Sequence, residues 1–376
     1  MEFRKGLDGK KFFRRFIILI VITILAVMKY KEFRLNKIIT DVSDLVRDPN
    51  SVDYVNDLYI SDGRHAKYLL NDKEREDYNK IYAAIKEHKN SVTLTLDKNE
   101  YSNELIVKMV EVIGMDHPEL IYFSYLGYRK VGRDVEVSIS YSMDENQYQQ
   151  NLQNMQYIIN NIKEETNNMN EYEKCKYVYE WLGKNNIYGD TKGTLAHSAY
   201  SAFPGEGFPV CEGFAKATQI IMQNIGINSI LVVGRRNNGE LHDWNMVKIE
   251  GKYYYFDATS SVALKNILSD PICYLGFLIE DVNQYKPSNY CKKLLPRVNG
   301  KKYRYHIYND LEIKFSDTDE CYKRIQEIAD NKPENAVIEF RVKNISEFNK
   351  HKAEVEQYLG AKCYTFKGSK KLVFFK

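Results

Sequence analysis

The sequence Val210-Cys211-Glu212-Gly213-Phe214-Ala215 opens a segment with the apolar spacing of a helix. Pro209 disfavours helix immediately upstream, and Gly226 stands where a helix terminator belongs. The apolar positions of one helical face are Phe214, Ala217, Ile221 and Ile225. We therefore expect Cys211 in the first turn of a helix of about four turns, where the backbone dipole favours a thiolate and lowers the thiol pKa. A buried structural cysteine is the alternative that this segment alone leaves open.

A β-hairpin is predicted downstream of this helix. The expected strand 241–249 contains His242 and Trp244, and Glu250-Gly251 is a tight turn from which the chain returns toward Asp257. If these two residues alone form the turn, Trp244 lies opposite Asp257 and His242 is its diagonal neighbour on the same face. That register brings an imidazole within reach of a carboxylate, which is the pairing of base and orienting acid that a cysteine nucleophile needs.

These segments together resemble the transglutaminase-like superfamily. The resemblance rests on Val210-Cys211-Glu212-Gly213-Phe214-Ala215, His242-Asp243-Trp244-Asn245 and Asp257-Ala258-Thr259, in this order, and Asn186-Ile187-Tyr188 and Ala199-Tyr200-Ser201-Ala202 resemble the family's lead-in. It covers roughly residues 170 to 262 and implies an α+β fold of papain-like, transglutaminase-like type, with the nucleophile helix against an antiparallel sheet. Cys211, His242 and Asp257 are then the catalytic triad.

Two departures from the family pattern concern residues close to the triad. Asp243 replaces the usual small residue after the histidine, and strand alternation should point it away from Cys211. Gly189 separates Tyr188 from Asp190, where the family often has the two residues adjacent. Neither departure removes a triad member.

Four residues are predicted to support the site. We expect Gly213 to leave room for a substrate backbone and Trp244 to pack beside the triad. Tyr188 and Tyr200 are candidates for stabilising an oxyanion, with core packing as the alternative role. The backbone N–H of Cys211 is the safer oxyanion donor, because amides at a helix start point outward unpaired. His197, just upstream of the cysteine, is a weaker candidate for the base because it lacks the spacing and acidic partner of His242.

The N-terminal sequence predicts an uncleaved signal anchor. Lys and Arg residues precede an uncharged apolar run from Phe16 to Met28, and further cations follow it. The run is shorter than a full span of ~20 residues, although flanking cations can snorkel. Ala26-Val27-Met28 is a weak cleavage site, so a cleaved signal peptide is one alternative and a buried helix another. We expect a cytoplasmic tail (1–15), a transmembrane anchor (16–30) and a single-pass cell-membrane protein whose catalytic domain is extracytoplasmic.

The remaining regions predict two further α+β parts. Residues 31–168 are expected to form a stem and an N-terminal α+β region, with helices over 72–85, 101–112 and 147–161 and strands over 120–128 and 135–141. Residues 169–290 are the predicted transglutaminase-like catalytic domain. Residues 291–376 are expected to form a small C-terminal α+β domain with strands over 303–315, 336–342 and 363–375 and helices over 319–329 and 346–359.

Composition limits the possible partners and cofactors. The chain has 376 residues and a net charge of only +3, without a basic stripe beyond the N-terminus, which argues against nucleic acid. Its six cysteines form no C-x-x-C pair and no metal-ligand spacing, so neither a metal nor another cofactor is implied. A single disulfide is neither supported nor excluded.

The resemblance implies thiol-dependent amide-bond chemistry through a thioester intermediate. Hydrolysis, as in a cysteine protease, is favoured over cross-linking by the family's bacterial branch, and the expected substrates are proteins or peptides, with cell-wall peptides and surface proteins of a bacterial envelope as candidates. The alternative is a non-catalytic surface binding or scaffolding protein with a vestigial transglutaminase-like fold.

Overall fold

The computed structural model describes residues 66–94, 101–189, 194–203, 208–263, 265, 272–279, 285–303, 312–313, 323, 327, 330, 338–342, 345–359, 362–365 and 371–375. All of them belong to one compact unit, Tyr54–Lys376. The predicted tail and anchor, 1–30, lie outside these ranges. No helix among the described residues is long and apolar enough to cross a membrane.

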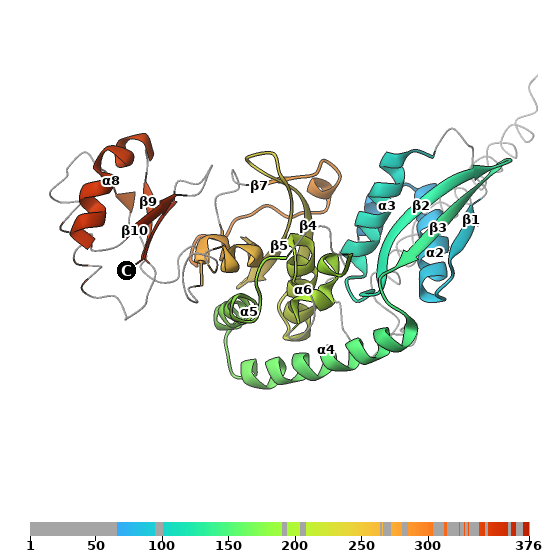
Figure 1. Cartoon of the computed structure of the whole chain (residues 1–376), viewed down its shortest axis with the longest axis horizontal. Helices are drawn as coiled ribbons and strands as arrows, with labels where there is room; N and C mark the ends of the chain where they lie inside the picture. Colours follow the sequence, from blue (N-terminus) through green and yellow to red (C-terminus); the bar gives the residue numbers. More distant parts are fainter. Residues whose placement is uncertain are drawn as a thin grey trace, which may run out of the picture. The chain divides into compact units, whose positions relative to one another are not determined.

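The N-terminal part of the described chain contains three helices and a three-stranded sheet (Figure 1). The helices are α2 (Asp72–Lys86), α3 (Asn103–Asp116) and α4 (Glu145–Thr166). The antiparallel strands β1 (Ser91–Leu94), β2 (Phe123–Val131) and β3 (Asp134–Tyr141) have the order β1-β3-β2. Asn71 and Asp144 form capping boxes that start α2 and α4. The predicted elements are present here, and the short strand β1 is an addition.

The central sheet is antiparallel and has the order β6-β5-β4-β7. Its strands are β4 (Ser229–Arg236), β5 (Leu241–Ile249), β6 (Lys252–Phe256) and β7 (Tyr285–Pro287). The helix α5 (Glu171–Asn185) precedes two 3-10 turns, η3 (Thr194–His197) and η4 (Ala199–Ala202). The sheet is followed by η5 (Ala258–Val262), η6 (Tyr274–Gly276) and η8 (Cys291–Lys293).

Helix α6 (Cys211–Asn224) packs against β4 and β5 (Figure 1). Its apolar face is buried, and two polar contacts fix its position on the sheet. The side chain of Asn245 donates to the carbonyl of Ala215 at 3.0 Å, and the side chain of Gln219 accepts from the backbone of Leu231 at 2.7 Å. This arrangement confirms the predicted α+β core, in which a nucleophile helix covers an antiparallel sheet.

The hairpin between β5 and β6 has the predicted register. Glu250 and Gly251 both adopt positive φ, 48° and 74°, as a two-residue type I′ turn requires. Ile249 therefore pairs with Lys252, and four further pairs follow up to the pair of Asn245 with Phe256. The next position along β6 is Asp257, on the side of the sheet where His242 lies.

The C-terminal elements form a separate four-stranded sheet of order β10-β11-β9-β8. Its strands are β8 (Glu312–Ile313), β9 (Ile338–Val342), β10 (Lys362–Thr365) and β11 (Lys371–Phe375), and the helix α8 (Ile345–Leu359) follows β9 in the chain. The prediction of one strand over 363–375 is wrong, because β10 and β11 pair antiparallel. The intervening sequence contains Gly368-Ser369, a composition typical of turns.

Candidate active site

The thiol of Cys211 lies at the first residue of α6. The preceding residue, Val210, offers no side chain to cap the helix, so the amides of the first turn remain available. The backbone N–H groups of Glu212 and Asp243 hydrogen-bond the sulfur. Asp243 directly follows His242 in β5, and the thiol is therefore placed against the strand that carries the predicted base.

The prediction that the helix start lowers the pKa of Cys211 is wrong. Burial and the carboxylates of Asp243 and Asp257 raise the pKa of this thiol to about 11, although the two backbone N–H groups act in the opposite direction. Desolvation of the thiolate outweighs the helix dipole here. At neutral pH the resting thiol is protonated, so it needs a base that removes its proton during the reaction.

His242 and Asp257 form the predicted pair of base and acid. The Nε2 of His242 lies 2.9 Å from the Oδ2 of Asp257, and the two side chains are 5% and 0% exposed. Since Nε2 faces the carboxylate, Nδ1 is the ring nitrogen left to accept a proton from a thiol. Asp257 stands between β6 and η5, and its backbone N–H donates to the carbonyl of Gly276 at 2.8 Å.

The Oδ2 atom of Asp257 has three more donors around it. They are the Nη2 of Arg236 at 2.9 Å, the Oγ of Ser260 at 3.0 Å and the hydroxyl of Tyr285 at 2.8 Å. Burial by itself would raise the pKa of Asp257, but the interaction with His242, the charge of Arg236 and the hydrogen bonds hold this pKa well below its usual value. The carboxylate is therefore ionised at any pH near neutrality.

These three donors were missed from the sequence. Arg236 had a usable signal, because it ends β4 just before the turn at Asn237-Asn238-Gly239, at the same end of the sheet as His242. Ser260 follows Asp257 by three residues, and the 3-10 turn η5 brings the two side chains close. Tyr285 had no signal, since it reaches the site through the pairing of β7 with β4.

A family model of the transglutaminase-like superfamily matches residues 160–258, the range that contains Cys211, His242 and Asp257. The chain carries a transglutaminase-like domain. A solved structure described as "Crystal structure of a TGase" matches at 12% identity with a TM-score of 0.26, covering 48% of this chain. The chain covers 52% of that structure, about half its length. No curated protein matches the chain.

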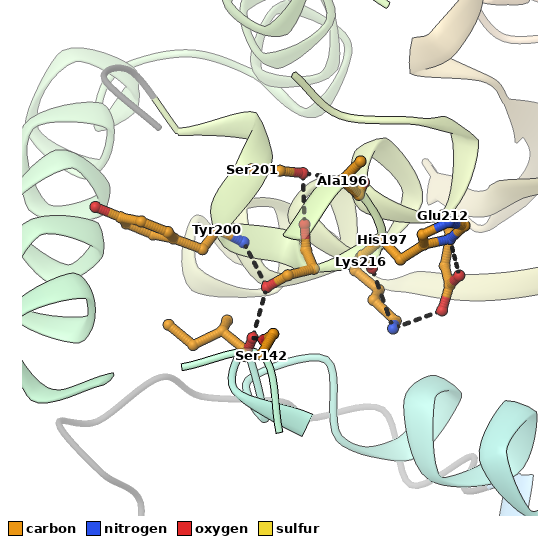
Figure 2. Close-up of polar contacts among 9 residues, drawn as sticks. Ser142, Ala196, His197, Tyr200, Ser201, Glu212 and Lys216 are labelled. Atoms are coloured by element: carbon orange, nitrogen blue, oxygen red, sulfur yellow. Dashed lines mark hydrogen bonds and ion pairs between the residues drawn. The ribbon is translucent and has the colours of Figure 1, made fainter. Parts of the chain in front are cut away.

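A second charged group of the transglutaminase-like domain surrounds Glu212, the residue after the nucleophile. Figure 2 shows its carboxylate between His197, at 2.8 Å, and Lys216, at 2.6 Å. Burial opposes its ionisation, but the charge of Lys216 and the hydrogen bonds from His197 and Lys216 lower the pKa of Glu212 to about 2. His197 is thus engaged by Glu212, while His242 is the histidine paired with Asp257.

Asp243 belongs electrostatically to this second group rather than to the triad. Burial and the charges of Glu212 and Glu111 raise its pKa well above the usual value, against the opposing effects of Lys216 and His197. The sequence predicts that strand alternation points this side chain away from Cys211. Its charge still acts on the thiol, because Asp243 is the carboxylate that raises the pKa of Cys211 most.

Two of the predicted supporting residues have structural roles in the core. A Cβ on Gly213 would lie 2.5 Å from the carbonyl oxygen of Ala196 and 2.6 Å from the Oγ of Ser201. The prediction that Gly213 leaves room for substrate is therefore corrected: it allows the η3–η4 segment to approach α6. Tyr200 is 2% exposed, and its hydroxyl accepts from Asn154 at 3.4 Å, which supports core packing.

Trp244 and Tyr188 flank the triad. Trp244 is 1% exposed and packs against the rings of His242 and Tyr285, as expected of a residue beside the site. Tyr188 is 45% exposed and does not belong to the core. Its hydroxyl hydrogen-bonds both the sulfur and the backbone N–H of Cys211. Within the described ranges, no group of three or more His, Cys, Asp or Glu residues could hold a metal ion.

Proposed function

We propose that the transglutaminase-like domain is a thiol enzyme that acts on amide bonds of proteins or peptides through Cys211, His242 and Asp257. The observation that supports it best is the 2.9 Å contact between Nε2 of His242 and Oδ2 of Asp257. The residue after His242 in the same strand, Asp243, binds the sulfur of Cys211 through its backbone N–H. Core packing does not require a buried imidazole–carboxylate pair beside a helix-start thiol, but acyl transfer does.

The proposed reaction begins with attack of the Cys211 sulfur on the amide carbonyl carbon. The thiol proton passes to Nδ1 of His242, while Asp257 stays ionised and stabilises the imidazolium. Collapse of the tetrahedral species breaks the C–N bond, and the imidazolium returns its proton to the leaving amine. A thioester between Cys211 and the acyl group remains. Water or an amine then attacks the thioester carbonyl carbon and gives up a proton to His242. The C–S bond breaks, the carboxylic acid or the new amide leaves, and the imidazolium returns this proton to the sulfur to restore the thiol.

The backbone N–H of Cys211 and the hydroxyl of Tyr188 are the proposed donors to the developing oxyanion. Both lie beside the sulfur, and in the resting structure they hydrogen-bond each other. When a substrate carbonyl oxygen enters this position, the two groups give up their mutual hydrogen bond. Both then donate to the negative charge that develops on the oxygen. Tyr188 thus has a chemical role in this proposal, whereas Tyr200 stays in the core.

We favour hydrolysis of the thioester over transfer to an amine, on the resemblance of the three motifs to the family's bacterial members. The predicted anchor at 16–30 places this activity at the outer side of a cell membrane, which makes envelope peptides and surface proteins the proposed substrates. Incubation of such candidates with wild type and Cys211→Ala, followed by mass spectrometry, identifies the cleaved bonds.

Alkylation of Cys211 tests the triad directly. Wild type and His242→Ala are treated with iodoacetamide at neutral pH, and the peptide that contains Cys211 is quantified by mass spectrometry, which separates it from the other cysteines. We expect His242 to take up the thiol proton during alkylation, so that the wild type is labelled about 10²-fold faster than the variant without the base. Equal slow labelling of both proteins favours the non-catalytic scaffold instead.

A further inference from the structure

Arg236 contacts both buried members of the triad. It is the last residue of β4, and its backbone pairs with Tyr285 of β7. Its Nη2 lies 2.9 Å from the Oδ2 of Asp257 and 3.1 Å from the Nε2 of His242. The three groups form a close triangle at one end of the sheet.

The hydrogens available in this triangle determine where the proton of the imidazole lies. A guanidinium only donates, so the 3.1 Å contact of Nη2 with Nε2 would be a hydrogen bond only for an unprotonated Nε2, whereas Nη2 donates to the carboxylate of Asp257 in either tautomer. If Nε2 of His242 carried a lone pair, it would face the negative Oδ2 atom at 2.9 Å without a proton between them. Nε2 therefore carries the proton, and Nδ1 keeps the lone pair that the thiol needs.

Charge balance gives Arg236 a second role. Asp257 is fully buried, and a buried carboxylate needs a cation or it takes up a proton. Ser260 and Tyr285 donate to it but carry no charge. In the described part of the chain its ion pairs are with Arg236 and His242. If Arg236 supplies the positive charge, the imidazole does not have to be charged in the resting enzyme.

We propose that Arg236 is a positioning residue of the triad: it balances the charge of Asp257 so that His242 rests as a neutral ring, protonated at Nε2 and ready to accept a proton at Nδ1. This role rests on the proposed function. It distinguishes the site from one with a preformed thiolate–imidazolium pair and agrees with a resting Cys211 that is a neutral thiol. The titratable groups that face the triangle from the neighbouring elements are Cys211, Tyr188 and Tyr285, and Asp243 of β5 acts on the thiol of Cys211.

The test compares Arg236→Met, Arg236→Gln and Arg236→Lys with wild type in the full chain. Arg235→Met is the matched control, because the side chain of this neighbouring arginine of β4 is exposed and donates to the carbonyl of Gly239, at 2.8 Å. Two quantities are measured: the protonation of the His242 ring by ¹⁵N NMR across pH, and the turnover of an activated acyl ester across pH. Ester hydrolysis needs His242 as a neutral base to activate water.

We expect the wild-type ring to be protonated at Nε2 alone near neutral pH. In Arg236→Met and Arg236→Gln the ring takes its second proton at higher pH, and the acid limb of turnover moves by the same amount. At a pH within that limb, turnover falls about tenfold for each pH unit of this movement. Arg236→Lys restores most of the wild-type behaviour because it retains the charge, and Arg235→Met equals wild type.

The outcomes separate this role from the proposed function. The proposed role of Arg236 is wrong if His242→Ala abolishes turnover while Arg236→Met keeps both the acid limb of the wild-type pH profile and the wild-type protonation of the His242 ring. If His242→Ala turns over the ester as fast as wild type, both proposals fail. If Arg236→Met does not fold, the comparison of Arg236→Gln with Arg236→Lys tests the role of Arg236 instead. A wild-type His242 ring that is protonated at Nδ1 alone would contradict the proposal even without a variant.

Discussion

The imidazole of His242 donates to Asp257 across a hairpin whose turn has only two residues. The two-residue turn fixes the register of β5 against β6, so the backbone places His242 within 2.9 Å of Asp257. The carboxylate is fully buried and shares its Oδ2 atom among four donors, Arg236, His242, Ser260 and Tyr285. Its charge is therefore central to both stability and chemistry.

Asp257→Asn should lose activity and stability together. The amide leaves Arg236 without its anion, and because the arginine side chain is 37% exposed, water recovers part of the penalty. We expect a loss of about 2–4 kcal/mol in the free energy of unfolding by urea. Ser260→Ala removes one neutral donor and should cost only about 1 kcal/mol. Equal stability of Asp257→Asn and wild type would show that the carboxylate charge is not engaged.

Tyr188→Phe tests the proposed oxyanion donor. Loss of the hydroxyl should lower kcat for an activated acyl ester by about 10²-fold and leave KM nearly unchanged, because the donor acts on charge that develops in the transition state. Tyr200→Phe is the control, since this tyrosine is buried in the core and its hydroxyl accepts from Asn154. A rise in KM at constant kcat would assign Tyr188 to substrate binding instead.

Gly213→Ala should destabilise the domain although alanine is the better helix former. The added Cβ meets the backbone carbonyl of Ala196, which cannot move as freely as a side chain, so we expect a cost of about 1–3 kcal/mol in thermal or urea unfolding. Gly114→Ala is the matched helical control, because its Cβ meets only the flexible end of Lys216 at 3.3 Å. A stabilised Gly213→Ala protein would contradict the close approach of η3–η4.

Glu111 should make stability depend on pH. Burial and the charge of Glu212 raise its pKa from 4.5 to about 7. A raised folded-state pKa means that its stabilising contribution is complete below pH 4.5 and is lost as pH rises through about 7. The melting temperature of Glu111→Gln relative to wild type should therefore increase over this window. The exposed Glu104 of the same helix provides the control substitution, Glu104→Gln, and a flat difference for Glu111→Gln would refute the shift.

The triad elements could be predicted from the sequence because their signals are local. A proline and an apolar period define the start of α6, and a two-residue turn fixes the partner of His242. The surroundings could not be predicted in the same way. Arg236, Ser260 and Tyr285 meet at Asp257 through the tertiary pairing of β4 with β7 and through a 3-10 turn, and neither leaves a periodic pattern.

The protonation state of Cys211 shows a different limit of sequence reasoning. The helix start is visible in the sequence and favours a thiolate, but the burial and the nearby carboxylates of Asp243 and Asp257 are not. The role of Gly213 was misjudged for the same reason. A missing side chain leaves space for a substrate or for the protein's own backbone, and only the packing of Ala196 shows which.

Acylation of Cys211 by an activated ester is the most direct test of the triad. Wild type is mixed with p-nitrophenyl acetate, quenched in acid and digested, and the mass of the peptide that contains Cys211 is measured by mass spectrometry. Cys211→Ser and His242→Ala serve as comparisons. The account predicts one acetyl group on the wild-type peptide, removed by hydroxylamine as expected of a thioester, and almost none in His242→Ala at the same time. Equal acetylation of wild type and His242→Ala, or acetylation confined to other cysteines, would contradict it.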